Sequence, residues 1–178
     1  YFVTETFWRF LRGLRDRGLE SIRGDLVVDN TYFAEPTARP GDFDGRPHRV
    51  YNAQPDALSL NFQSTSFYMV PEPAKNAVRV FLEPPLANFT IDSRLRLVDG
   101  PCVWRHYYPK TLITPISEGA RIALEGDFSA RCREGSLNRL VTTPPEHVFG
   151  AFVQLWADSG GGFSGSMRVA ATPPNAKL

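Results

Sequence analysis

Apolar positions near the start of the chain repeat with the period of an α-helix. Four apolar residues recur at three- and four-residue steps, namely Phe7, Phe10, Leu11 and Leu14. The pattern predicts an amphipathic helix over residues 4–17, with Thr4 as its N-cap and Gly18 just past its last turn. A second helix is predicted to begin at Pro144-Pro145-Glu146 and to end at the glycines 160–162, because Phe149, Phe152, Val153 and Trp156 repeat in the same way.

Between these helices, short apolar runs alternate with polar residues and are separated by Pro, Gly or Asn. They predict strands at 22–29, 58–62, 67–70, 78–82, 89–91, 95–98, 102–108, 121–125 and 127–132, followed by a closing strand at 163–169. The central runs favour an antiparallel meander. The expected fold class is α+β, with amphipathic helices packed on a mostly antiparallel β-sheet and a smaller β-rich lobe. We expect residues 1–70 with 136–178 to form an outer α/β lobe and 71–135 an inner antiparallel β lobe.

Residues 30–55 form a long irregular stretch. Four prolines and two glycines interrupt it, which excludes regular helix and disfavours a central strand. Its aromatic residues, Tyr32, Phe33, Phe43 and Tyr51, indicate that it packs against the rest of the protein. Long loops in compact domains tend to be functional, so this stretch is a candidate site.

Composition excludes several classes of protein. The 178 residues are 42% hydrophobic and 22% charged, as in ordinary globular domains. The net charge of +1 from 20 basic and 19 acidic residues gives no reason to bind nucleic acid. No apolar run reaches the roughly 18 residues of a membrane span. The N-terminus lacks the pattern of a signal peptide, so any export signal is expected outside this sequence.

Cysteine and histidine spacing gives no metal site. Cys102 and Cys132 belong to no CxxC motif, so they form either a disulfide or two buried free thiols. The three histidines stand far apart, and Asp42-Phe43-Asp44-Gly45 is only a faint match to a calcium loop. No metal or cofactor is expected.

Motifs for serine catalysis are incomplete in this sequence. A penicillin-reactive serine needs lysine three residues later, and no lysine among Lys75, Lys110 and Lys177 follows a serine in this way. Ser136-Leu137-Asn138 matches Ser-x-Asn in three letters, and Lys110-Thr111-Leu112 lacks the glycine of Lys-Thr-Gly. We interpret both as coincidences.

Several segments together resemble a known enzyme family. They are Leu14-Arg15-Asp16-Arg17-Gly18, the strand 23–29, Tyr51-Asn52-Ala53-Gln54-Pro55-Asp56-Ala57-Leu58, Ile91-Asp92-Ser93-Arg94-Leu95, and Gly100-Pro101-Cys102 with Cys132. Their order and spacing resemble the insertion of the serine-type D-alanyl-D-alanine carboxypeptidase/endopeptidases, which are low-molecular-mass class C penicillin-binding proteins. In that family, the insertion lies between Ser-x-x-Lys and the two later motifs.

The resemblance implies a non-catalytic region that shapes the cleft of a peptidoglycan-cleaving enzyme. Its partners would be peptidoglycan stem peptides and the parent's catalytic domain, and its location periplasmic or secreted. It further implies a Cys102–Cys132 disulfide. Tyr51 corresponds to a pocket aromatic, and Asp44 or Asp42 would provide a carboxylate for the amino end of the stem peptide, although Arg46 lies nearer the expected spacing.

Two other functions remain open on the sequence alone. One is a secreted, non-enzymatic β-rich module that binds cell-wall glycan or peptide through Trp104, Tyr107 and Tyr108. The other is a hydrolase with a dispersed triad using one of the three histidines, His48, His106 and His147.

Overall fold

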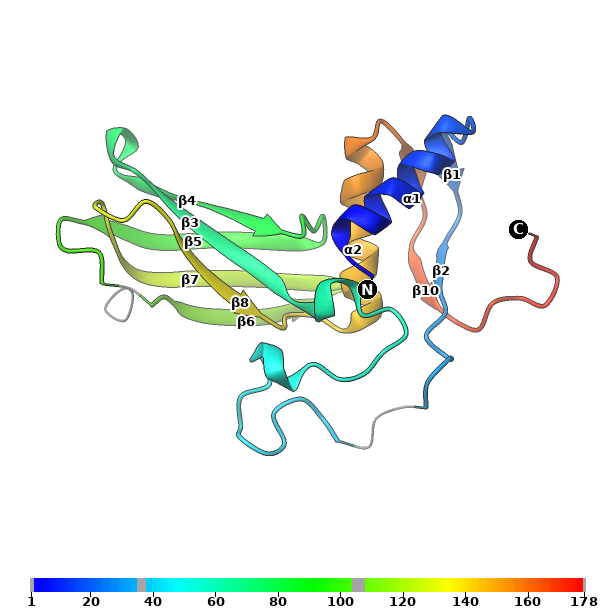
Figure 1. Cartoon of the computed structure of the whole chain (residues 1–178), viewed down its shortest axis with the longest axis horizontal. Helices are drawn as coiled ribbons and strands as arrows, with labels where there is room; N and C mark the ends of the chain where they lie inside the picture. The colour runs from blue at the N-terminus through cyan, green and yellow to red at the C-terminus, as the bar shows by residue number, and fades with distance from the viewer. Residues whose placement is uncertain (1, 35–37, 104–107, 178) are drawn as a thin grey trace.

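The computed structural model describes residues 2–34, 38–103 and 108–177. Its helices are α1 (Thr4–Asp16) and α2 (Pro144–Asp158), with 3-10 turns η1 (Val50–Asn52), η2 (Leu60–Gln63) and η3 (Pro73–Lys75). Its strands are β1 (Ser21–Arg23), β2 (Leu26–Val28), β3 (Thr65–Glu72), β4 (Ala77–Glu83), β5 (Phe89–Val98), β6 (Lys110–Ile116), β7 (Gly119–Ser129), β8 (Gly135–Arg139), β9 (Gly162–Ser164) and β10 (Met167–Val169). The predicted α+β class is confirmed. Figure 1 shows an elongated β lobe beside the helices, with the irregular loop running beneath both.

Helix α1 begins at the predicted residue and ends one residue before the predicted end, but the expected cap is wrong. Val3, not Thr4, is the N-cap, and it makes no side-chain hydrogen bond. Instead Asn61, which is 57 positions away in the sequence, caps the helix. Its Oδ1 accepts from the Thr4 backbone N–H at 3.0 Å, and its Nδ2 donates to Thr4 Oγ1 at 2.7 Å. Gly18 follows the last turn with φ of +92°, as predicted for a helix-ending glycine.

Helix α2 is the centre of the helical lobe. It begins with a capping box in which Thr143 and Glu146 satisfy each other's backbone N–H groups. Trp156 is fully buried, and its indole N–H donates to the Gly162 carbonyl at 2.8 Å. One apolar core joins both helices to η2 and contains Phe7, Leu11, Leu60, Leu86, Val148, Ala151, Phe152, Leu155 and Trp156.

The β lobe consists of two three-stranded sheets with a shared core. One sheet has the order β4-β3-β8 and is antiparallel throughout. The other has the order β5-β7-β6, in which β6 is antiparallel to β7 but β5 is parallel to it. The core between them contains Phe67, Met69, Val78, Ala120, Ile122, Leu124, Phe128, Cys132 and Leu137. The predicted meander is therefore wrong at β5, which pairs with a strand that is not its neighbour in sequence.

Two predicted strands are each broken in the middle. Residues 22–29 form β1 and β2, and residues 163–169 form β9 and β10, which pair with them in parallel. Gly24 lies at the break with φ of +119°, and a side chain on Gly165 would collide with the Gly24 carbonyl. The two backbone segments approach each other closely at these glycines, which explains why each predicted strand is interrupted there.

The predicted strand at 58–62 is wrong. The segment contains the 3-10 turn η2, and Asn61 and Phe62 have φ of 47° and 56°. The backbone turns there because Asn61 is bound to α1 while Leu60 is buried in the helical core. In the predicted strand 102–108, positions 104–107 lie outside the described residues. The division into 1–70 with 136–178 and 71–135 stays a prediction; β3 is the central strand of its sheet and pairs with β4 on one side and β8 on the other.

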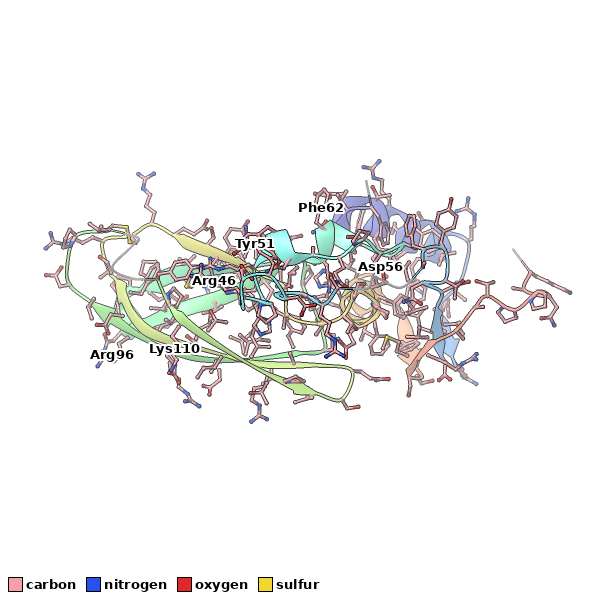
Figure 2. The ribbon with its side chains drawn as sticks, turned by 90° about the horizontal axis from the view of Figure 1, so that it is seen from below. Arg46, Tyr51, Asp56, Phe62, Arg96 and Lys110 are labelled. Atoms are coloured by element: carbon pink, nitrogen blue, oxygen red, sulfur yellow. A yellow bond between two sulfur atoms is a disulfide. The ribbon has the colours of Figure 1, made fainter. Side chains whose placement is uncertain are left out.

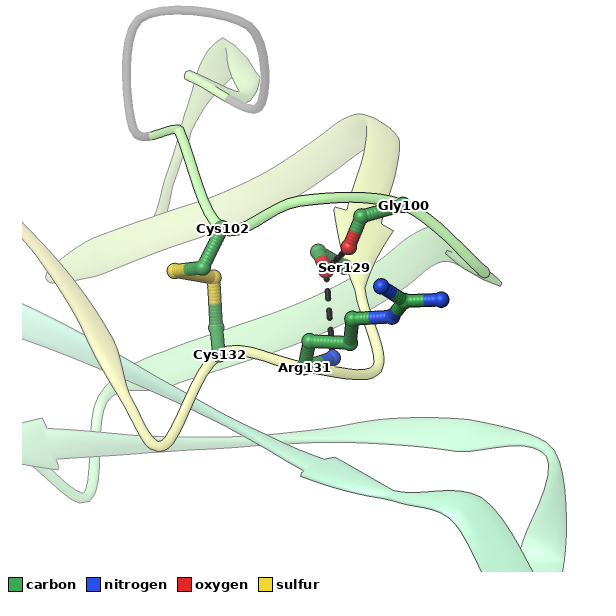
Figure 3. Close-up of a disulfide and its surroundings, with 5 residues drawn as sticks. All are labelled: Gly100, Cys102, Ser129, Arg131 and Cys132. Carbon is green, nitrogen blue, oxygen red and sulfur yellow. Dashed lines mark hydrogen bonds between the residues drawn. A yellow bond between two sulfur atoms is a disulfide. The ribbon is translucent and has the colours of Figure 1, made fainter.

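Cys102 and Cys132 form a disulfide, as the family resemblance implied, with Cα atoms 5.0 Å apart. Figure 3 shows it beside Ser129, whose hydroxyl donates to the Gly100 carbonyl at 2.6 Å and accepts from the Arg131 N–H at 3.1 Å. The bridge and these bonds hold the end of β7 against the segment that follows β5. Among the described residues, no helix has the length and apolar character needed to cross a membrane.

The Asn61 cap predicts a stability difference between two glycine substitutions. Asn61→Gly keeps the left-handed backbone accessible but removes both bonds to Thr4, so it should lower the free energy of unfolding by about 1–2 kcal/mol. Asn76 has a similar φ of 48° and no comparable cap, so Asn76→Gly should change stability by less than about 0.5 kcal/mol. Urea denaturation of both variants checks this; equal costs would contradict the capping role.

Candidate functional site

The candidate site lies in the irregular stretch that the sequence singled out. This stretch is attached to the end of β8 through His48 and Leu140. The Leu140 N–H donates to the His48 carbonyl at 3.0 Å, and His48 Nδ1 lies 2.9 Å from the Leu140 carbonyl oxygen. Since a carbonyl can only accept, Nδ1 carries the proton. The paired bonds fix the loop on the junction between β8 and α2.

Within the loop, Asp44 and Tyr51 form a hydrogen-bonded cluster. The Tyr51 hydroxyl donates to Asp44 Oδ2 at 2.7 Å. Asp44 Oδ1 accepts from the Arg46 backbone N–H at 2.9 Å and from Asn52 Nδ2 at 3.1 Å. Asn52 is buried and also donates to the Arg46 carbonyl at 2.9 Å, so its side chain joins both Asp44 and Arg46 and stabilises the turn between them. The structure thus brings together two of the three predicted site residues.

The cluster favours the ionised form of Asp44. Desolvation raises the pKa of its carboxyl, but the hydrogen bonds from Tyr51, the Arg46 backbone and Asn52, with the nearby Arg46 charge, outweigh it and leave the pKa below its ordinary value. The same bond to Asp44 raises the pKa of the Tyr51 phenol. At neutral pH, the pair is therefore a carboxylate held by a neutral phenol.

Asp42 lies apart from this cluster. Its Oδ2 accepts from the Arg39 backbone N–H at 2.7 Å, which makes it a turn-forming carboxylate. Phe43 lies between the two acids in sequence; it is 77% exposed, and its ring centroid is 6.1 Å from that of Tyr51, itself 60% exposed. An exposed aromatic surface therefore flanks Asp44. Figure 2 shows Tyr51 and Arg46 close together on this part of the loop.

Two cavities adjoin the loop. A cavity of about 470 Å³ separates it from the start of α2 and is lined mainly by prolines and polar side chains, among them His48, Gln54, Asp56, Gln63 and Glu146. A smaller one of about 200 Å³ is lined by Gly45, Arg46, Pro47, His48, Arg49 and Arg139. Sequence reasoning missed Asn52 and Arg139. For Asn52, its place directly after Tyr51 was a usable signal, whereas Arg139 joins the loop only through the fold.

The histidines show no triad in the described structure. The His48 ring binds a backbone carbonyl, and His147 is buried with neither ring nitrogen hydrogen-bonded. Burial lowers the pKa of His147 to about 4, so its ring is neutral at pH 7. His106, Trp104 and Tyr107 lie outside the described residues. Within the described ranges, no group of three His, Cys, Asp or Glu side chains could hold a metal ion.

Comparison with known proteins gives one family and one fold. A sequence model of the D-Ala-D-Ala carboxypeptidase 3 (S13) family matches residues 2–178. The fold is similar to that of penicillin binding protein 4 (dacB) from Haemophilus influenzae, with 15% sequence identity and a TM-score of 0.65 over 99% of this chain and 38% of that one. The same protein complexed with a novel β-lactam matches with 13% identity and a TM-score of 0.54, over 99% of this chain and 35% of that one.

The chain thus spans well under half the length of the solved chains that it matches. No curated protein sequence shows a significant match.

The Asp44–Tyr51 bond predicts a measurable pKa change. In a carbon-detected NMR titration, the Asp44 carboxyl should have a pKa below its ordinary value, and Tyr51→Phe should move it upward because the largest stabilising hydrogen bond is lost. Since the folded-state pKa is depressed, Asp44 contributes stability above the ordinary carboxyl pKa and loses it as pH falls through the lower folded value.

Tyr32→Phe is the control for this titration, because Tyr32 is exposed, its ring pairs with Phe33, and the hydrogen bonds to Asp44 come from Tyr51, Arg46 and Asn52. An unchanged Asp44 pKa in Tyr51→Phe would contradict the arrangement.

Proposed function

The chain belongs to the D-Ala-D-Ala carboxypeptidase 3 (S13) family, and from this premise we propose that it is a non-catalytic insertion region of a serine-type carboxypeptidase/endopeptidase that acts on peptidoglycan. The parent enzyme would acylate its serine with the penultimate D-alanine and release the terminal residue, or cleave a cross-link. The chain described here would shape the cleft in which the stem peptide lies. The observation that carries the proposal is the family match over nearly the whole chain, in a sequence without Ser-x-x-Lys or Lys-Thr-Gly.

The share of the solved chains that this chain covers supports an insertion. It matches 38% and 35% of their lengths with almost all of its own. The remaining length would hold the catalytic motifs, so the catalytic domain of the parent is the proposed partner. The Cys102–Cys132 disulfide supports a periplasmic or secreted location, since disulfides persist in oxidising compartments.

Asp44 is the proposed contact for the amino end of a stem peptide. A carboxylate has about four acceptor positions, and the three bonds from Tyr51, Arg46 and Asn52 leave room for one more donor. Oδ2 accepts a single one of these bonds and is the atom that an ammonium would contact. The exposed rings of Phe43 and Tyr51 would cover the apolar arm that carries the ammonium.

A binding experiment tests this contact. A stem peptide with a free side-chain ammonium should bind the chain, and the same peptide with that amine acetylated should bind about tenfold more weakly because a charge-assisted hydrogen bond is lost. Asp44→Asn should weaken binding of the free amine by a similar factor in isothermal titration calorimetry.

Asp99→Asn is the matched control, because Asp99 is an exposed carboxylate paired with Arg131 beside the disulfide. Equal affinity for the two peptides would reject Asp44 as the amine contact. Binding of glycan without peptide stems would instead favour the non-enzymatic module.

If the catalytic serine lies in the parent's catalytic domain and not in this chain, the chain's response to a fluorescent penicillin can be predicted. The isolated chain should acquire no covalent label, since it has no serine with lysine three residues later. Gel fluorescence and intact mass spectrometry check this, with a penicillin-binding protein of known reactivity as the positive control. Stoichiometric labelling of a serine in this chain would disprove its non-catalytic role.

A further inference from the structure

Three arginines gather at the small cavity beside the candidate site. Arg46 and Arg49 come from the loop and Arg139 from the end of β8, and together with His48 they line a space of about 200 Å³. Among the residues that the structure describes, no carboxylate lines this cavity. The pairing of β8 with β3 positions Arg139 at the cavity, and the His48–Leu140 hydrogen bonds position the loop that carries Arg46 and Arg49.

Arg139 is a buried cation with neutral partners. It is only 8% exposed, and its Nη1 donates to the Tyr108 hydroxyl at 2.8 Å and to the Asn138 carbonyl at 2.9 Å. In the part of the chain that the structure describes, none of the three arginines forms an ion pair within 4.0 Å. Other arginines of the β lobe do, as in Arg94–Glu125, Arg96–Asp127 and Arg131–Asp99.

The arginines are also crowded. Arg49 Nη1 donates to the same Tyr108 hydroxyl oxygen at 3.4 Å, and the guanidinium carbons of Arg139 and Arg49 lie 5.3 and 6.0 Å from the Tyr108 ring centroid. Contact with an aromatic face offsets part of the cost of such charges. Two like charges around one oxygen still repel each other, and a buried cation without a counter-charge is destabilising. An anion in the cavity would relieve both effects.

We propose that this cavity binds an oxyanion, either the terminal carboxylate of a peptide or a phosphate. A guanidinium presents paired N–H donors in the geometry that carboxylate and phosphate oxygens accept. The cavity is smaller than typical sites for whole ligands, which start near 300 Å³, so it holds the anionic group and leaves the rest of the ligand outside. The site is formed by arginines and does not depend on the Asp44 contact or on the proposed function.

The experiment uses three probes with the intact chain: N-acetyl-D-alanine, its amide, and inorganic phosphate. Binding is followed by NMR through the backbone amides of Arg46 and Arg49. We expect the acid or phosphate to bind and the amide not to bind. Arg49→Gln should weaken anion binding about tenfold, since one charge-assisted contact is lost. The control Arg96→Gln should leave it unchanged, because Arg96 pairs with Asp127 on the β lobe.

Each outcome decides the proposal. Binding of the acid over its amide assigns the site to a peptide carboxylate, and binding of phosphate alone assigns it to phosphate. The proposal is overturned if neither anion binds, if acid and amide bind equally, or if Arg49→Gln binds as well as the wild type. Thermal unfolding verifies that each variant is folded, and Arg139→Lys, which keeps the charge but loses the planar fork, gives a second test with the same expected weakening.

Asp44→Asn should retain anion binding, so failure of the amine contact and failure of this site are separate results.

Discussion

The candidate site depends on one pair of backbone-directed hydrogen bonds, those between His48 and Leu140. Leu140 is 4% exposed and lies just beyond β8, where the ladder with β3 has ended. Its backbone N–H and carbonyl would be buried without partners, which is costly. His48 satisfies both, through its own carbonyl and its ring. In its described residues the loop has no strand and no α-helix, only the 3-10 turn η1, and these two bonds fix it to the junction between β8 and α2, beside Arg139.

The rest of the loop is held by short-range polar contacts. Asp42 and Asp44 each accept a backbone N–H from a nearby residue, and Asn52 ties the turn to the Arg46 carbonyl. Further along, Gln63 reaches the Thr142 carbonyl at the start of α2. Such contacts order the loop in the absence of a ligand, which lowers the entropic cost of ordering it when a ligand binds. The low pKa of Asp44 has the same origin, since the donors that shape the turn also stabilise its carboxylate.

The sequence predicted those features that depend on neighbouring residues. Helices α1 and α2 followed from the spacing of their apolar residues, and Gly18 from helix-ending chemistry. The prediction of a strand at 58–62 was wrong because Asn61 is hydrogen-bonded to Thr4, 57 positions away, and no local sequence pattern indicates this contact. The parallel pairing of β5 with β7 is equally non-local. Asp44 and Tyr51 were found by family resemblance, whereas Arg139 needs the fold to bring β8 to the loop.

The proximity of opposite charges in this loop raises the question of why they do not simply neutralise each other. Arg46 stands two residues from Asp44 and lowers its pKa through its charge, yet the two side chains form no ion pair within 4.0 Å. Neutral donors, the Tyr51 hydroxyl and the Asn52 amide, take the positions on Asp44 that a guanidinium would occupy. Tyr108 does the same for Arg139, since its neutral hydroxyl accepts where a carboxylate would otherwise bind. Neutral partners therefore hold each charge in place, and under the two proposals the carboxylate would contact a cationic group of a ligand and the arginines an anionic one.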